Sequence, residues 1–267
     1  MERSLDLLLR QTRIDETLYD SVLDFWQELA YLQLSQKALS LRLTTIQNVA
    51  GSVATRRQLT NSQSGVLKSS LETTGLFAQD VNRSLRLRSS LWRDFLAAAH
   101  LAQMEQPPPV ADQLNDPFWQ RALRFYVARA GGRELANHLL EAGEANPFHE
   151  QLFSLAAWLP ETREDGPWRR RTLVQLGQLV VKPAIPLSVR QRAVAVLAAS
   201  GESGVMALLR QLLQHSDANV RIMAVGAVAR FDPEQCVPLL QDMLRDGDAN
   251  VRVAAVHALG WQYDELS

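Results

Sequence analysis

The stretches "DANVRIMAVGAVARFD" (217–232) and "DANVRVAAVHALG" (248–260) repeat one pattern at a spacing of 31 residues. A weaker copy surrounds Val189-Arg190, which aligns with Val220-Arg221 and Val251-Arg252. Small and branched apolar residues recur at helical spacing in each copy, which predicts a helix with one buried face. Leucines at helical spacing follow the copies that contain Val189 and Val220, which predicts a second amphipathic helix in each of these repeats. Such helix pairs bury their apolar faces only by stacking on their neighbours, so we expect a solenoid over residues 166–267.

Residues 187–262 resemble HEAT repeats, especially the short variety of the phycobilisome lyases. This resemblance implies that the arginine after each valine joins adjacent repeats. We therefore expect a structural ladder of Asp217, Arg221, Asp248 and Arg252. It also implies that a protein partner binds a concave face lined by the second helices. The candidate contacts, chosen by helical position, are Arg210, Gln211, Gln214, Gln241, Asp242 and Arg245.

A proline-rich linker is predicted at 106–116, because the three prolines that begin at Pro107 cannot continue a helix. Before it, helical patterns at 19–34, 39–49 and 62–73 end at Gly75. "LFAQDVNRSLRLR" (76–88) predicts a β-hairpin, because Leu85 and Leu87 alternate with arginines. A helix, "SLWRDFLAAAHLAQM" (90–104), follows. Residues 17–105 therefore predict a winged-helix-like domain.

The same region resembles the winged-helix part of bacterial NACHT-type STAND NTPases, which ends in a motif Phe-x-His-x-Ser-Phe-Gln-Glu-Tyr-Leu-Ala-Ala. The matching positions here are Leu87, Ser89, Leu91, Trp92, Arg93, Asp94, Phe95, Leu96, Ala97 and Ala98. Residues 1–16 are similar to a remnant helix of the family's helical subdomain, and 117–165 to its helical arm. The family's His, Ser and Gln-Glu are replaced by Ser89, Leu91 and Arg93-Asp94. The resemblance implies a regulatory or sensing region that serves in signalling or defence.

No phosphate-binding G-x-x-x-x-G-K-[ST] motif occurs in the sequence, so we do not expect nucleotide hydrolysis. The chain is then either a fragment or split-gene product, or a stand-alone relative without the NTPase core. One alternative is a subunit that works with a separately encoded NTPase chain. Another is a chromophore-protein module like the phycobilin lyases, which predicts HEAT units in the N-terminal half as well.

Nucleic-acid binding is a further alternative, because Arg83, Arg86, Arg88 and Arg93 are possible phosphate contacts on a winged-helix hairpin. A net charge of −1 disfavours it. The full expectation is an all-α protein: a winged-helix-like domain with a small β-hairpin, followed by an α-solenoid of HEAT-like repeats.

We expect a non-catalytic scaffold without cofactor or metal, because the histidines never fall at ligand spacing. The single cysteine, Cys236, aligns with Val205 and is therefore expected in the core. The N-terminus lacks the pattern of a signal peptide and no run is long enough to span a membrane, so a cytoplasmic location is expected. Trp261 and Tyr263 either fold back as a cap on the last helix, or further repeats or a partner cover it.

Overall fold

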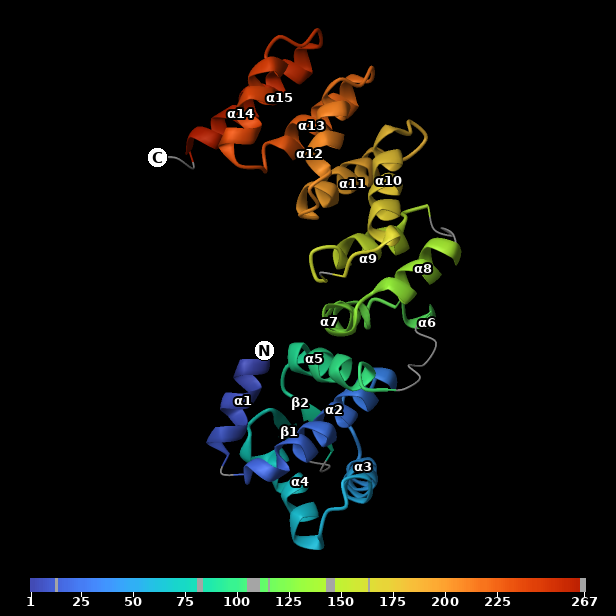
Figure 1. Cartoon of the computed structure of the whole chain (residues 1–267), viewed down its shortest axis with the longest axis vertical. Coiled ribbons are helices and arrows are strands. Elements are labelled where there is room, and N and C mark those ends of the chain that lie inside the picture. Colours follow the sequence, from blue (N-terminus) through green and yellow to red (C-terminus); the bar gives the residue numbers. More distant parts are fainter. Residues whose placement is uncertain are drawn as a thin grey trace. The chain divides into compact units, whose positions relative to one another are not determined.

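The computed structural model describes residues 1–12, 14–80, 84–104, 111–114, 116–142, 147–162 and 164–264. They fold into two compact units, Met1–Gly131 and Gly132–Ser267. Within these ranges every element is a helix except for one two-stranded hairpin, which confirms the predicted all-α fold (Figure 1). Across this part of the chain, no helix combines the length and apolar character needed to cross a membrane.

The core of the N-terminal unit is built around one long helix, α2 (Tyr19–Ser35). Its elements are α1 (Glu2–Gln11), the 3-10 helix η1 (Glu16–Leu18), α2 (Tyr19–Ser35), α3 (Leu43–Arg56), α4 (Asn61–Thr73), β1 (Phe77–Gln79), β2 (Leu85–Leu87), α5 (Ser90–Leu101), α6 (Ala111–Leu114) and α7 (Gln120–Ala130). The α2 helix packs along α5 and also contacts α3 and α4. One face of α2 is apolar and fully buried, and it includes Val22, Phe25 and Trp26.

The β-hairpin forms as the alternating pattern predicts. Phe77 pairs with Leu87 in an antiparallel register, and Leu85 and Leu87 are buried while Arg86 and Arg88 are exposed. Leu41, two residues before α3, forms an isolated antiparallel bridge with Leu85. From α2 to α5 the elements therefore follow in the order helix, bridge, helix, helix, hairpin and helix.

The boundary between the compact units falls after α7, inside the arm predicted for 117–165. The α7 helix packs on α5, where the rings of Phe95 and Phe125 meet edge to face at 5.5 Å. Arg121 of α7 also bonds to the buried Asp94 of α5. These contacts attach α7 to the N-terminal unit. Most of the linker predicted for 106–116 lies outside the described residues.

A buried hydrogen bond joins α2 to α4 and gives a first prediction. The Trp26 Nε1–H donates to the Ser70 Oγ at 2.9 Å, and both side chains are buried. Ser70→Ala leaves this donor without a partner, so we expect a loss of about 2 kcal/mol in the free energy of unfolding. Urea titration followed by circular dichroism measures it. The neighbouring variant Ser69→Ala, at an exposed position of the same helix, is the control, and equal losses in both variants would contradict the prediction.

The C-terminal unit consists of helices that pack in sequence order. They are α8 (Arg133–Ala142), α9 (Glu150–Trp158), α10 (Pro167–Val181), α11 (Leu187–Ala199), α12 (Val205–Leu213), α13 (Ala218–Val228), α14 (Pro233–Met243) and α15 (Ala249–Asp264). The first helices of the repeats pack in a row, α11 against α13 and α13 against α15. Ala193, Ala224 and Ala255, which share one repeat position, are all fully buried. The 31-residue pattern therefore corresponds to a structural repeat.

Candidate protein-binding surface

The contact between α11 and α13 contains an arginine that the repeat carries in each copy. The buried Arg190 donates from Nε to the Val180 carbonyl at 2.8 Å and from Nη2 to Asp217 Oδ2 at 3.1 Å. Asp217 also caps α13, because its Oδ1 accepts from the Asn219 N–H at 2.9 Å. This N–H and, to a lesser degree, the Arg190 guanidinium lower the pKa of Asp217. One carboxylate thus begins a helix and ties it to the preceding repeat.

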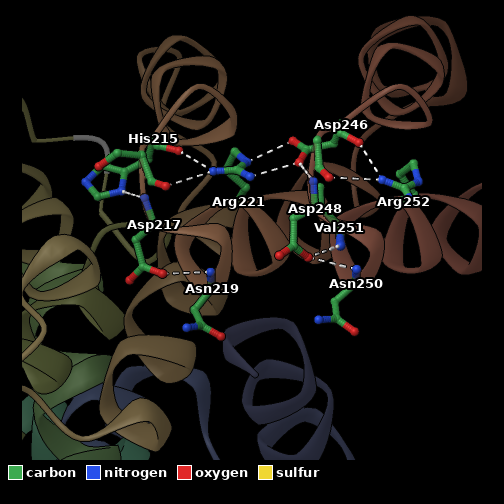
Figure 2. Close-up of polar contacts among 11 residues, drawn as sticks. His215, Asp217, Asn219, Arg221, Asp246, Asp248, Asn250, Val251 and Arg252 are labelled. Atoms are coloured by element: carbon green, nitrogen blue, oxygen red, sulfur yellow. Dashed lines mark hydrogen bonds and ion pairs between the residues drawn. The ribbon is translucent and has the colours of Figure 1, made fainter.

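A bidentate ion pair joins α13 to the turn before α15 (Figure 2). Arg221 donates from Nε and Nη2 to the two carboxylate oxygens of Asp246, each at 2.8 Å. Its Nη1 donates to the His215 and Ser216 carbonyls at 2.8 and 3.0 Å. The hydrogen bonds from Arg221 are the main cause of the lowered pKa of Asp246. Arg221 therefore connects the turn of its own repeat to the turn of the next.

The other two residues of the predicted ladder, Asp248 and Arg252, make contacts of a different kind. Asp248 does not pair with Arg221 but caps α15, where its Oδ1 accepts from the Asn250 N–H at 2.8 Å. Arg252 bonds to the Asp246 and Gly247 carbonyls (Figure 2). Arg190 was not predicted as part of the ladder, although the repeated Val-Arg pair contained that signal. Asp246 was not predicted either, because its counterpart 31 residues earlier is His215 and the repeat pattern therefore contains no acidic residue at this position.

The lowered pKa values predict that acid weakens the C-terminal unit. A carboxylate with a folded pKa below its unfolded value of about 3.8 stabilises fully above that pH, and the contribution is lost as the pH falls through the folded pKa. We expect the free energy of unfolding to fall between about pH 5 and pH 3, and to fall less in Asp246→Asn, which has no charge to lose. Urea titrations at both pH values measure this. Parallel pH profiles for the two proteins would contradict it.

The second-helix surface, formed by α10, α12 and α14, contains the predicted binding residues. The six candidates Arg210, Gln211, Gln214, Gln241, Asp242 and Arg245 are all exposed, as expected from their helical positions. Between α10 and α12 lies a groove of about 640 Å³. Its apolar lining includes Leu173, Val174, Val181, Ala207, Leu208 and Leu212, and its polar lining includes Arg170, Gln178, Gln211 and His215. Of the six candidates, the lining includes Gln211, and the apolar residues of the groove were not singled out from the sequence.

Among the described residues, the arginines proposed as phosphate contacts have different surroundings. Arg86 and Arg88 are exposed on the hairpin, and the Nε of Arg88 donates to the Phe77 carbonyl at 3.1 Å. Arg93 instead pairs with the buried Asp94 and lies over the ring of Phe118 at 4.3 Å. Arg83 lies outside the described residues. The structure therefore leaves two of the four arginines on one exposed strand face.

Cys236 lies in the core of the repeats, as its alignment with Val205 predicts. The side chain is fully buried, and burial raises the pKa of its thiol. Because the thiolate is the reactive form, we expect a maleimide to label the native chain at least about tenfold more slowly than the urea-unfolded chain. Mass spectrometry of timed samples measures the two rates. Equal rates would show that the thiol is reachable in the folded protein.

Charged and metal-ligating side chains also occur outside the repeat contacts, within the described residues. The described residues contain no group of three histidine, cysteine or acidic side chains that could hold a metal ion. Glu164 accepts hydrogen bonds from the Gly132 and Arg133 backbone N–H groups at 2.8 and 3.1 Å. Arg169 bonds to Glu202 and to the Leu159 and Thr162 carbonyls. These charged groups hold loops in place.

Comparison with known proteins identifies the repeats. Residues 186–260 match the family described as HEAT repeats, in agreement with the resemblance seen over 187–262. No curated protein and no solved structure gives a significant match to the chain. HEAT repeats generally act as scaffolds for protein interaction, through the extended surfaces that stacked helices offer. The matched segment contains both arginine contacts and the α12 side of the groove.

Proposed function

We propose that this chain is a non-catalytic protein-interaction scaffold that binds a protein partner on its second-helix surface. The groove between α10 and α12 carries this proposal, because its lining combines several apolar side chains with a few polar ones. Apolar pockets with a few polar groups at the edge are typical of sites that bind side chains of a partner. The arginine contacts support the proposal, since they hold α11, α13 and α15 in a fixed stack beneath this surface.

Site-specific crosslinking tests the proposal. A photo-crosslinking amino acid replaces Gln211 in the groove, and in a second protein it replaces Gln191, an exposed glutamine of α11. We expect a crosslinked partner in the lysate of the source organism from the Gln211 position and none from Gln191. We also expect Val174→Glu, a change at an exposed residue of the groove, to abolish the Gln211 product. A product that forms equally from both positions would count against the groove.

A relation to STAND NTPases is a second candidate, supported by the element order of the N-terminal unit. In that unit three helices, a hairpin and a further helix follow one another, which supports the winged helix predicted from the sequence. Ser89, which replaces the family's histidine, caps α5 by accepting from the Leu91 N–H at 3.2 Å. We propose that the unit is a regulatory module that works with a separately encoded NTPase chain. Co-purification with the product of the neighbouring gene tests this, and failure to recover any NTPase chain would count against it.

Nucleic-acid binding has the weaker support, because Arg93 is occupied by Asp94 and an aromatic ring. The hairpin residues Arg86 and Arg88 would provide the phosphate contacts in that case. Binding to duplex DNA would then weaken steeply with salt and disappear in the double variant Arg86→Glu with Arg88→Glu. Absence of binding to a duplex at low salt eliminates this function.

A further inference from the structure

Arg252 makes only half of the contacts that its counterpart Arg221 makes. In both residues Nη1 donates to two carbonyls of the preceding turn, which are those of Asp246 and Gly247 for Arg252. In Arg221 the remaining donors, Nε and Nη2, bind the two oxygens of Asp246. No carboxylate among the described residues lies within ion-pair distance of Arg252, whose side chain is exposed. A planar guanidinium with two parallel donors free is suited to a carboxylate.

Two apolar side chains near the end of the repeat segment are exposed at positions that are buried in the earlier repeats. Val256 is 59% exposed, whereas its counterparts Val225 and Val194 are 1% and 4% exposed. Leu244, at the end of α14, is 37% exposed, whereas its counterpart Leu213 is 2% exposed. Arg252 and Val256 are four residues apart on α15 and therefore lie on one side of the helix. We call Arg252, Val256 and Leu244 the outward α15 surface.

The equivalent contact one repeat earlier indicates what kind of element would cover such a surface. One repeat earlier, α15 packs on α13, and the turn before α15 supplies Asp246 to Arg221. We propose that the outward α15 surface binds an amphipathic helix of another protein, with an acidic residue in the turn before it. The helix would cover Val256 and Leu244, and the carboxylate would accept two hydrogen bonds from Arg252.

A second folded copy of this chain does not offer the same contact. The side of α15 that would be needed already lies against α13, with Val251 and Ala255 fully buried. The occupant is therefore more suitably a different protein, one with a helix whose apolar side is not already packed against another helix. This surface is separate from the groove between α10 and α12, so the experiments on the two sites can fail independently.

The binding test uses a synthetic peptide of residues 244–264, which contains Asp246 and the α15 sequence. A staple between the positions of Val253 and His257, both exposed in the chain, holds it helical. We expect saturable binding to the full chain by fluorescence anisotropy, and at least about tenfold weaker binding to Val256→Asp. The control is Leu187→Asp, a change at another exposed leucine, which should leave the affinity unchanged. Circular dichroism verifies that both variants are folded.

A charge exchange tests the role of Arg252. We expect Arg252→Glu to weaken peptide binding at least about tenfold, and a peptide with Asp246→Lys to restore it. Failure of the peptide to saturate, or equal binding to the wild-type chain and to Val256→Asp, would overturn the proposal. A dimer of the wild-type chain that Val256→Asp dissociates would also overturn it, since the occupant would then be a second copy. Light scattering of both proteins measures that outcome.

Discussion

Arg221→Ala is expected to lower the free energy of unfolding of the C-terminal unit by about 3 kcal/mol. The change removes both hydrogen bonds to Asp246 and both bonds to the carbonyls of the preceding turn. It leaves the mostly buried carboxylate of Asp246 without its cation. The loss of one partner from such a pair is costly because the remaining charge stays out of water. Urea titration followed by circular dichroism measures the difference.

Arg252→Ala is the matched control, because the same residue type occupies the same repeat position 31 residues later. Arg252 is exposed and has bonds to carbonyls only, so we expect a loss of less than about 1 kcal/mol. The comparison separates the ion pair from the general effect of shortening a long side chain. Equal losses in the two variants would mean that the contact with Asp246 does not stabilise the stack.

Asp94→Ala is expected to lower the free energy of unfolding of the N-terminal unit by at least about 3 kcal/mol. The buried Asp94 accepts from the Nε of Arg93 at 2.8 Å and from the Nε of Arg121 at 2.6 Å. Arg93 is itself largely buried, so its charge would lose its partner inside the protein. Because Arg121 belongs to α7, the change also loosens the contact between α5 and α7. Thermal unfolding followed by circular dichroism gives the comparison.

Arg121→Ala serves as the control for Asp94. Its side chain is about half exposed, and its removal leaves Asp94 paired with Arg93. We therefore expect a loss of about 1 kcal/mol, well below that of Asp94→Ala. If Arg121→Ala destabilised the unit as strongly as Asp94→Ala, the stability would depend on the docking of α7 rather than on the buried charge.

The repeats were predictable because the same physical requirement recurs at a fixed step. Every first helix needs small residues where it meets its neighbour, so Ala193, Ala224 and Ala255 carry the signal in the sequence itself. The hairpin was predictable for a similar reason, since Leu85 and Leu87 alternate with exposed arginines. In both regions, residues that are close in the sequence are enough to predict which side chains are buried.

The polar contacts were predicted less well, because their partners are set by three-dimensional packing. Asp246 occupies the place of His215 and yet provides the acid for Arg221, a pairing that no periodicity contains. Arg93 follows the exposed Arg86 and Arg88 in the sequence. Its side chain nevertheless pairs with Asp94 and lies over the ring of Phe118. The groove between α10 and α12 depends on Val174 and Leu208, which belong to different helices. Such contacts and grooves can be recognised only when the arrangement of the helices in space is known.

The arginine contacts give the repeat array a polarity. Arg190 and Arg221 each donate to a carboxylate in the turn that follows their own repeat, so the two sides of a repeat are chemically unlike. Repeats of this kind join in one orientation, as head-to-tail subunits of a filament do. A duplication of 31 residues copies the donor and the turn together. The gene can therefore lengthen the array by whole units without a new interface having to arise.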